Sequence, residues 1–565
     1  MSKTAMLRNG APWPVRWGLL NPWTWFSLSV MAVVLVPLLF IAIALLPGDD
    51  EMGVWAHIRE YRLSEYVQTS ILLCLGVSLI AGCIGVSTAW LVSMCSFPGR
   101  RVWEWALLLP LAVPAYIMAY TYTDLLDYGG PVQSALRSWF AWEHPDEYWF
   151  PAIRSLGGAM VMLGLVLYPY VYLTCRTAFL DQSVCVLEAG RTLGHGPWSC
   201  FWRIALPLAR PAMVAGLALV MMETLADYGT VDYFAVDTLT LGIYRTYTNL
   251  ESYAAASKLA AILLVVVAIV LIAERMSRGR RRYHHTTSRV RQLPRWQLRG
   301  WRAGLAVLAC VLPLILGFVV PAAVLVRRAI RHGDIHWQET VGNLAFNSFQ
   351  VSALAAVIAV TLALVVVYSA RLVPTWLTFA SRRVSGLGYA IPGVVIAVAI
   401  IIPLGWLDNF LVDVMRERMG WDVGLFLIGS IGAVVAAYVI RFMAVALGTL
   451  DAGLGRIAPS LDHAGRTLGA PPRRVLWSVH VPLMRGAVFT GLLLIFVDAM
   501  KELPATMILR PADFNTLAVR VHQLAKLEDL GQAAFPALMI LAVGLLPVIV
   551  LSRLIATARS VEGVS

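Results

Sequence analysis

The chain has 565 residues, of which 59% are hydrophobic and 14% are charged, and its mean hydropathy is +0.72. This composition excludes a soluble globular domain with an ordinary polar surface and indicates an integral membrane protein. Basic cytoplasmic loops account for the formal net charge of +12, so we expect no nucleic-acid partner.

Twelve apolar stretches are long enough to cross a bilayer, because a hydrocarbon core of about 30 Å requires about 20 helical residues. They predict an all-α integral membrane protein with twelve transmembrane helices and a lipid environment. The expected spans lie near residues 26–46, 70–94, 104–122, 156–178, 209–226, 256–273, 304–326, 347–370, 384–404, 424–446, 485–500 and 533–553.

Charge and composition divide the chain into two halves of six spans each. The expected regions are an interfacial N-terminal segment (1–24), a first domain (25–274), a basic cytoplasmic linker (275–302), a second domain (303–555) and a cytoplasmic tail (556–565). Arginine-rich loops alternate along the chain with acidic ones, which predicts a multi-pass protein whose basic loops and N- and C-termini are cytoplasmic. Arg327, Arg328 and Arg331 are the exception, because they fall in a loop expected outside. An even number of spans in each half gives the two halves a parallel orientation.

An internal repeat lies in two of the expected cytoplasmic loops, 180–208 and 449–483. Residues Ala189 to Gly194 recur as Ala464 to Gly469, and the same register of 275 residues pairs Trp202 with Trp477. Each copy precedes the fifth span of its half. The glycine at the end of each copy predicts a short helix, a turn and a second helix.

The repeated segment resembles the coupling loop, or EAA motif, of ABC import permeases. Glu188-Ala189-Gly190, Gly194, Ile204, Leu206 and Pro207 match the motif, whereas the second copy has His463 in place of the acid. The resemblance implies a type I ABC importer fold, in which two copies of a separate ATPase subunit dock on these segments. An amphipathic helix pair at the membrane surface is the alternative. The residues expected to contact the ATPase are Glu188, Ala189, Gly190, Arg191, Thr192, Gly194, His463, Ala464, Gly465, Arg466, Thr467 and Gly469.

No ATP site is expected within this chain. A phosphate-binding loop ends in Gly-Lys-Ser/Thr, and none of the four lysines, Lys3, Lys258, Lys501 and Lys526, follows a glycine. We therefore expect no cofactor here, with ATP and Mg²⁺ bound by the partner subunits, and no enzymatic activity of the chain alone. A secondary transporter would also have twelve spans, but it would have no use for two coupling segments.

The segments from Glu223 to Arg245 and from Val497 to Arg520 resemble the corresponding parts of ferric-iron permeases. This resemblance implies uptake of Fe³⁺ from a periplasmic ferric-binding protein across the bacterial inner membrane. Permeases of the same class for thiamine or another small solute remain the alternative.

Four acids form a candidate pathway for a cation. The repeat register aligns Glu223 with Asp498 and Asp227 with Glu502, and the two acids of each half are four residues apart, hence on one helix face. Carboxylates inside a membrane are costly and normally face a cavity or a partner. We expect a transient acidic passage without a tightly bound metal. The alternative is that the acids cap helix ends or pair with Lys501 and Arg245.

Overall fold

The computed structural model describes residues 21–43, 53–180, 182, 192–194, 196–278, 295–332, 338–421 and 424–562. Within these ranges ten helices are long and apolar enough to cross a membrane, or up to twelve if each of two bent pairs is one span. Apart from two paired two-residue strands, the regular structure of the described residues is helical. This confirms the predicted all-α membrane class.

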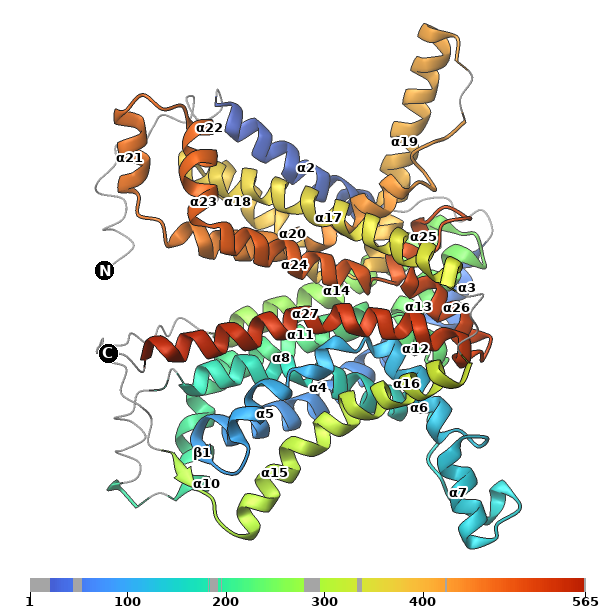
Figure 1. Ribbon diagram of the computed structural model, residues 1–565. Coiled ribbons are helices and arrows are strands. Elements are labelled where there is room, and N and C mark those ends of the chain that lie inside the picture. Colours follow the sequence, from blue (N-terminus) through green and yellow to red (C-terminus); the bar gives the residue numbers. More distant parts are fainter. Residues whose placement is uncertain are drawn as a thin grey trace. The chain divides into compact units, whose positions relative to one another are not determined.

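The chain forms two compact units, and each contains segments from both halves of the sequence (Figure 1). Unit 1 comprises residues 1–43, 350–391 and 399–499, and unit 2 comprises 44–349, 392–398 and 500–565. Three helices have residues in both units, namely α17 (Gln338–Leu372), α19 (Gly393–Met419) and α24 (Arg485–Met500).

Unit 1 is built from second-half helices together with the first span of the chain. Its further elements are α2 (Pro22–Ile43), α18 (Trp376–Ser385), η6 (Gly388–Ala390), α20 (Ile431–Gly455), α21 (Ser460–Thr467), α22 (Pro472–Val475), η7 (Leu476–His480) and α23 (Val481–Leu483). Helix α2 packs on α18, where the buried Ser27 hydroxyl lies 2.7 Å from the Ser381 hydroxyl.

Unit 2 contains the first-half helices, and α4 and α11 both pack against α8. Its first-half elements are α3 (Val54–Tyr61), α4 (Leu63–Met94), β1 (Cys95–Ser96), α5 (Arg100–Ala106), η1 (Leu109–Ala112), α6 (Ala115–Leu126), α7 (Pro131–Phe140), η2 (Pro145–Glu147), α8 (Leu156–Leu180), α10 (Pro197–Cys200), η3 (Phe201–Ala205), α11 (Leu206–Ala226), α12 (Gly229–Tyr233), α13 (Leu239–Thr248) and α14 (Tyr253–Arg278).

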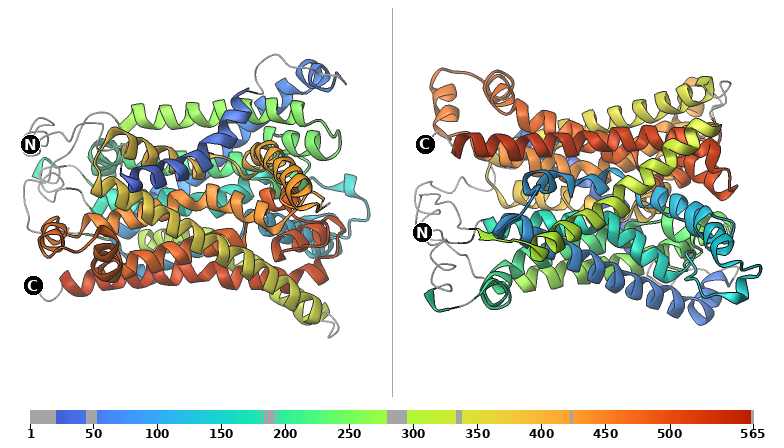
Figure 2. Two further views of the ribbon diagram at one scale, coloured as in Figure 1. Left: turned by 90° about the horizontal axis from the view of Figure 1, so that it is seen from above. Right: turned by 60° about the horizontal axis from the view of Figure 1, so that its bottom comes forward.

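Later segments of the chain complete unit 2. They are β2 (Trp296–Gln297), which pairs in parallel with β1, then α15 (Trp301–Leu314), η4 (Ile315–Val319), α16 (Val320–His332), α25 (Pro504–Leu509), α26 (Leu517–Lys526) and α27 (Leu530–Glu562). The continuous helix formed by α15, η4 and α16 crosses first-half helices, as the right-hand view of Figure 2 shows in yellow-green. Thus the first span of the second half packs on helices of the first half.

Prolines break two of the expected spans. The segment expected at 104–122 is divided between α5–η1 and α6, which meet at 90° where Pro114 precedes α6. The span expected at 384–404 starts later, because Pro392 immediately precedes α19 and a proline disfavours helix at the residue before it. The span expected at 485–500 is α24, which meets the preceding helix at 78°.

The internal repeat extends into matching hydrogen bonds. The Ser70 hydroxyl accepts from the Leu239 amide at 2.9 Å, and in the second half the Ser348 hydroxyl accepts from the Leu517 amide at 2.7 Å. Each bond ties the long second helix of its half to the short helix before the last span. The repeat is therefore structural as well as sequential.

One repeated contact has its charges inverted. In unit 2, Glu104 of α5 pairs with Arg176 of α8, and both side chains are buried. At the matching place in unit 1, Arg382 of α18 pairs with Asp451 of α20 at 2.6 Å, with both side chains 39% exposed. In each half the pair fixes a short helix to the long helix that leads into the cytoplasmic segment.

Glu104→Gln is expected to lower stability far more than Asp451→Asn. The first substitution leaves the Arg176 guanidinium buried without its charge partner, which costs about 3–5 kcal/mol, whereas an exposed pair contributes about 0–1 kcal/mol. Thermal unfolding of the purified variants in detergent measures both effects. Equal shifts of the unfolding midpoint would show that the buried pair contributes no more to stability than the exposed pair.

One of the three arginines that opposed the expected orientation, Arg328, has a counter-ion in unit 2. Arg328 of α16 forms a two-pronged ion pair with Asp124 of α6, whose Oδ2 atom lies 3.0 Å from the arginine Nε. The positive charge is therefore matched by a carboxylate within the protein. An arginine neutralised in this way is weaker evidence that its loop lies on the cytoplasmic side.

Candidate functional site

The second cytoplasmic segment has the expected helix, turn and second helix. Helix α21 is followed by a turn at Leu468 to Ala470 and then by α22. Gly465 is half-buried, and a Cβ atom there would lie 2.8 Å from the Val475 side chain, so glycine permits the close approach of the two helices. The side chains of His463, Ala464, Arg466 and Thr467, and Gly469 itself, are not buried.

A partly buried network ties this segment to other helices of unit 1. The Arg371 guanidinium donates from Nε to Asp462 Oδ2 at 2.7 Å, and Nε2 of the fully buried His480 lies 2.6 Å from Asp462 Oδ1. Arg371 also donates to the backbone oxygens of Leu454 and Ile457 at 2.7 and 3.0 Å. These bonds fix the start of α21 against α17 and η7.

Sequence reasoning missed this network. The only local signal is an acid one position before His463, and the contacts to Arg371 and His480 depend on the tertiary fold. By the repeat register the first copy has Leu187 and Ala205 at the positions of Asp462 and His480. The network therefore belongs to the second copy alone.

Most of the first cytoplasmic segment before its turn lies outside the described residues. Glu188, Ala189, Gly190 and Arg191 lie outside the described residues, whereas Thr192 and Gly194 are placed and exposed. Gly194 has φ +83° and Gly469 has φ +72°, both in the left-handed region that favours glycine. The preceding leucines are exposed at matching positions, Leu193 by 78% and Leu468 by 86%. Each turn thus presents an apolar side chain outward.

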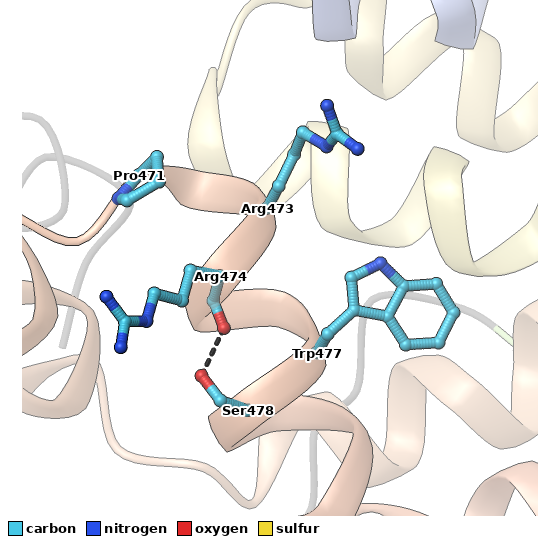
Figure 3. Close-up of a pocket in the computed structure, with 5 residues that line it drawn as sticks. All are labelled: Pro471, Arg473, Arg474, Trp477 and Ser478. Atoms are coloured by element: carbon cyan, nitrogen blue, oxygen red, sulfur yellow. Dashed lines mark hydrogen bonds between the residues drawn. The ribbon is translucent and has the colours of Figure 1, made fainter.

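An open hollow of about 590 Å³ lies beside the second segment. Its lining residues are Pro471, Arg473, Arg474, Trp477 and Ser478. In Figure 3 the Arg473 and Trp477 side chains extend to one side of their helix and Arg474 to the other, while the Ser478 hydroxyl donates to the Arg474 carbonyl oxygen. Two cations beside an exposed indole suit an acidic partner surface.

The two acids of the first half do not share one continuous helix, which corrects the expectation. Helix α11 ends at Ala226, and Asp227 follows it in an extended conformation, while Glu223 lies within the helix. The Asp227 carboxylate accepts from the backbone amides of Thr230 and Val231 at 3.1 and 3.2 Å. Asp227 therefore caps the short helix α12.

Glu502 has the same role in the second half. Helix α24 ends at Met500, and the Glu502 carboxylate accepts from the amides of Ala505 and Thr506 in α25 at 3.1 and 3.2 Å. For Asp227 and Glu502 the structure thus has the helix caps that were the alternative interpretation. Asp498 lies within α24, in unit 1, whereas the other three acids belong to unit 2.

The expected cationic partners have other contacts as well. The Arg245 guanidinium pairs with Asp237 at 2.6 Å, and the Lys501 ammonium donates to the Leu111 carbonyl oxygen at 3.3 Å. Among the described residues, no group of three or more His, Cys, Asp or Glu side chains gathers to hold a metal ion.

Two repeated halves of membrane-spanning helices, each with an exposed turn before its fifth span, are the architecture of a polytopic transport permease. The chain belongs to the family of binding-protein-dependent transport system inner membrane components, whose model matches residues 14–283 and 365–559.

Similar proteins include one permease that matches nearly the whole chain and others that match less than half of it. The Fe(3+)-transport system permease protein of Haemophilus influenzae is 23% identical over 545 residues, which cover 94% of this chain and 99% of that protein. The molybdenum transport system permease protein ModB of Escherichia coli is 29% identical over 29% of this chain and 70% of its own length. The sulfate transport system permease protein CysW of Escherichia coli is 25% identical over 46% of this chain and 89% of its own.

Proposed function

We propose that this chain is the membrane-spanning permease of an ABC importer for Fe³⁺ in the bacterial inner membrane, with both termini in the cytoplasm. A periplasmic binding protein delivers the iron. Two copies of a separate ATPase subunit bind ATP and Mg²⁺ and drive transport. The chain itself has no catalytic role.

The similarity to the Fe(3+)-transport permease carries this proposal. It runs through 94% of this chain and 99% of the relative, so both halves and their junction correspond. The half-length relatives support the permease class, but they do not cover the fused architecture.

Two exposed turns in one chain favour two ATPase contacts per copy. Gly194 and Gly469 create the turns, and the basic hollow around Arg473 and Trp477 adds an ionic surface beside the second one. The network of Asp462, Arg371 and His480 makes that second contact rigid, because α21 cannot move without η7.

Glu223 and Asp498 remain proposed members of a cation passage. Each lies inside a helix and is half-buried. Because conduction requires binding that is weak enough to release the ion, tight capture of iron belongs to the binding protein. Asp227 and Glu502 support the same passage by fixing the short helices that follow it.

Uptake of an oxyanion is the second candidate function, favoured by the sulfate and molybdenum transport relatives.

The decisive experiment reconstitutes the chain with its ATPase and binding protein in liposomes. Radioactive iron, sulfate and molybdate are then offered in parallel. We expect ATP-dependent uptake of iron alone, by a complex of one permease with two ATPase subunits according to its intact mass. Uptake of sulfate or molybdate without iron would replace the first candidate with the second.

A further inference from the structure

A buried chain of polar side chains links α6, α12 and α26 in unit 2. The Tyr120 hydroxyl lies 2.5 Å from Nδ1 of His522, and Nε2 of the same ring lies 3.0 Å from Asp232 Oδ2. The Lys526 ammonium lies 2.6 Å from the same carboxylate oxygen. A neutral imidazole satisfies both contacts if Nε2 donates to the carboxylate and Nδ1 accepts from the phenol.

Most side chains of this cluster are buried from solvent, and Lys526 is the exposed member. Tyr120 is 1% exposed and His522 is fully buried, and the Asp232 side chain is 7% exposed, whereas the Lys526 side chain is 47% exposed. Burial opposes the ionised form, but the hydrogen bonds from His522 and Lys526 lower the pKa of Asp232. A buried carboxylate is therefore kept negative by a lysine that has room to move away.

Two further phenols beside the cluster lack well-formed hydrogen bonds. Tyr228 is 1% exposed and its ring centre lies 5.5 Å from that of His522, while Tyr116 is 5% exposed and 5.8 Å from Tyr120. Neither hydroxyl has a described partner that meets strict hydrogen-bond geometry, and the Tyr228 hydroxyl interacts weakly with Asp232 and Tyr244. Buried polar atoms are nearly always satisfied in native proteins, so these oxygens require a physical explanation.

The cluster lies at the end of unit 2 opposite the first cytoplasmic segment. In Figure 1, α12 and α26 are at the right-hand end of this unit, whereas α10, which precedes α11, is at the left-hand end. With the coupling segments in the cytoplasm, as proposed, these side chains are on the side that receives cargo.

We propose that Asp232, His522 and Tyr120, with Tyr228 beside them, form a transient coordination site for Fe³⁺, from which Lys526 withdraws when the ion arrives. This inference rests on the proposed iron cargo. A hard trivalent cation prefers carboxylate and phenolate oxygens, and imidazole also suits iron. Each phenol that coordinates exchanges its O–H bond for an Fe–O bond and releases the proton to water. No electron transfer is involved.

The lysine explains why such a site would be weak. The Lys526 ammonium occupies the carboxylate that the metal needs, so binding must displace one cation by another of higher charge. Reversal of that exchange expels the iron, which matches the requirement that a conducting site releases its ion. The site would thus hold iron briefly after the binding protein releases it.

Spectroscopy and uptake together test this inference. Ferric citrate is titrated into the full-length protein in nanodiscs, and the visible charge-transfer band between phenolate and Fe³⁺ is recorded. We expect the band in the parent, with affinity about tenfold or more weaker in Tyr120→Phe and Asp232→Asn. Lys526→Gln removes the competing ammonium and should bind iron several-fold more tightly. Tyr168→Phe is the matched control, because this fully buried phenol also lacks a hydrogen-bond partner and lies outside the cluster.

The outcomes separate the two proposals. Unchanged iron affinity in Tyr120→Phe and Asp232→Asn, or weaker binding in Lys526→Gln, would show that the cluster is only an interlock between helices. If the reconstituted parent carries iron and these variants carry it equally well, the coordination site is wrong while the proposed function stands. Uptake of sulfate or molybdate instead of iron by the parent would overturn both. Unfolding midpoints within the range of Tyr168→Phe exclude misfolding as the cause of a loss.

Discussion

Gly194→Val and Gly469→Val are each expected to reduce the ATP hydrolysis that the binding protein stimulates in the reconstituted transporter. Both glycines have positive φ, and no atom of the described residues lies within 4 Å of an added Cβ, so the expected penalty is that of the backbone conformation. A β-branched residue in the left-handed region costs about 1–2 kcal/mol. Because that energy changes an equilibrium by a factor of about 5–30, stimulation should fall about fivefold or more.

The first site should show the larger loss, since the first copy retains Glu188 and lacks the network that anchors the second copy. Gly196→Val is the control. Gly196 likewise has no described atom within 4 Å of an added Cβ, and it is not among the described glycines in the left-handed region, so the same side chain should be tolerated. Membrane insertion is expected to be normal in all three variants. Parental stimulation in both turn variants would remove the coupling role of these segments.

Four amide substitutions are expected to lower the amount of iron carried per ATP hydrolysed, and the structure divides them into two pairs. Asp227→Asn with Glu502→Gln keeps a capping oxygen but removes the negative charge at the start of two short helices, so it should also lower the free energy of unfolding by about 0.3–1 kcal/mol per site. Glu223→Gln with Asp498→Asn removes charge inside two helices and should leave the unfolding midpoint near that of the parent.

Radioactive iron uptake into proteoliposomes, normalised to stimulated ATP hydrolysis, measures the effect on transport, and thermal unfolding measures the effect on the caps. The quadruple variant should carry the least iron. If Glu223→Gln with Asp498→Asn transports as well as the parent, those acids have no role in the passage. A loss confined to the other pair would assign the phenotype to the caps.

The spans and the repeat could be predicted because their signals are local. Apolar length marks a helix such as α20, and the recurrence of Ala189 to Gly194 marks equivalent turns without any knowledge of packing. The helix ends at Ala226 and Met500 were harder to predict from the sequence. An acid four residues after another is compatible both with a helix that continues and with a helix that ends before a capping acid. Only the hydrogen bonds to the following amides separate the two cases.

Contacts between distant residues could not be predicted from one sequence. Asp232 and His522 are 290 positions apart, and no periodic pattern relates them. The Asp462 network has the same character, since Arg371 and His480 reach it from 91 and 18 positions away. Sequence reasoning found the acids individually but not the partners that give each its role.

The inverted ion pairs have a consequence for the inheritance of this fused gene. A genetic exchange between the two halves, with its crossover between the codons for the short helix and those for the long one, would combine Glu104 with Asp451 in one product. The reciprocal product would combine Arg382 with Arg176. Each places like charges in one contact, where their repulsion opposes folding. We therefore expect recombinants of this kind to fold less stably than the parent chain.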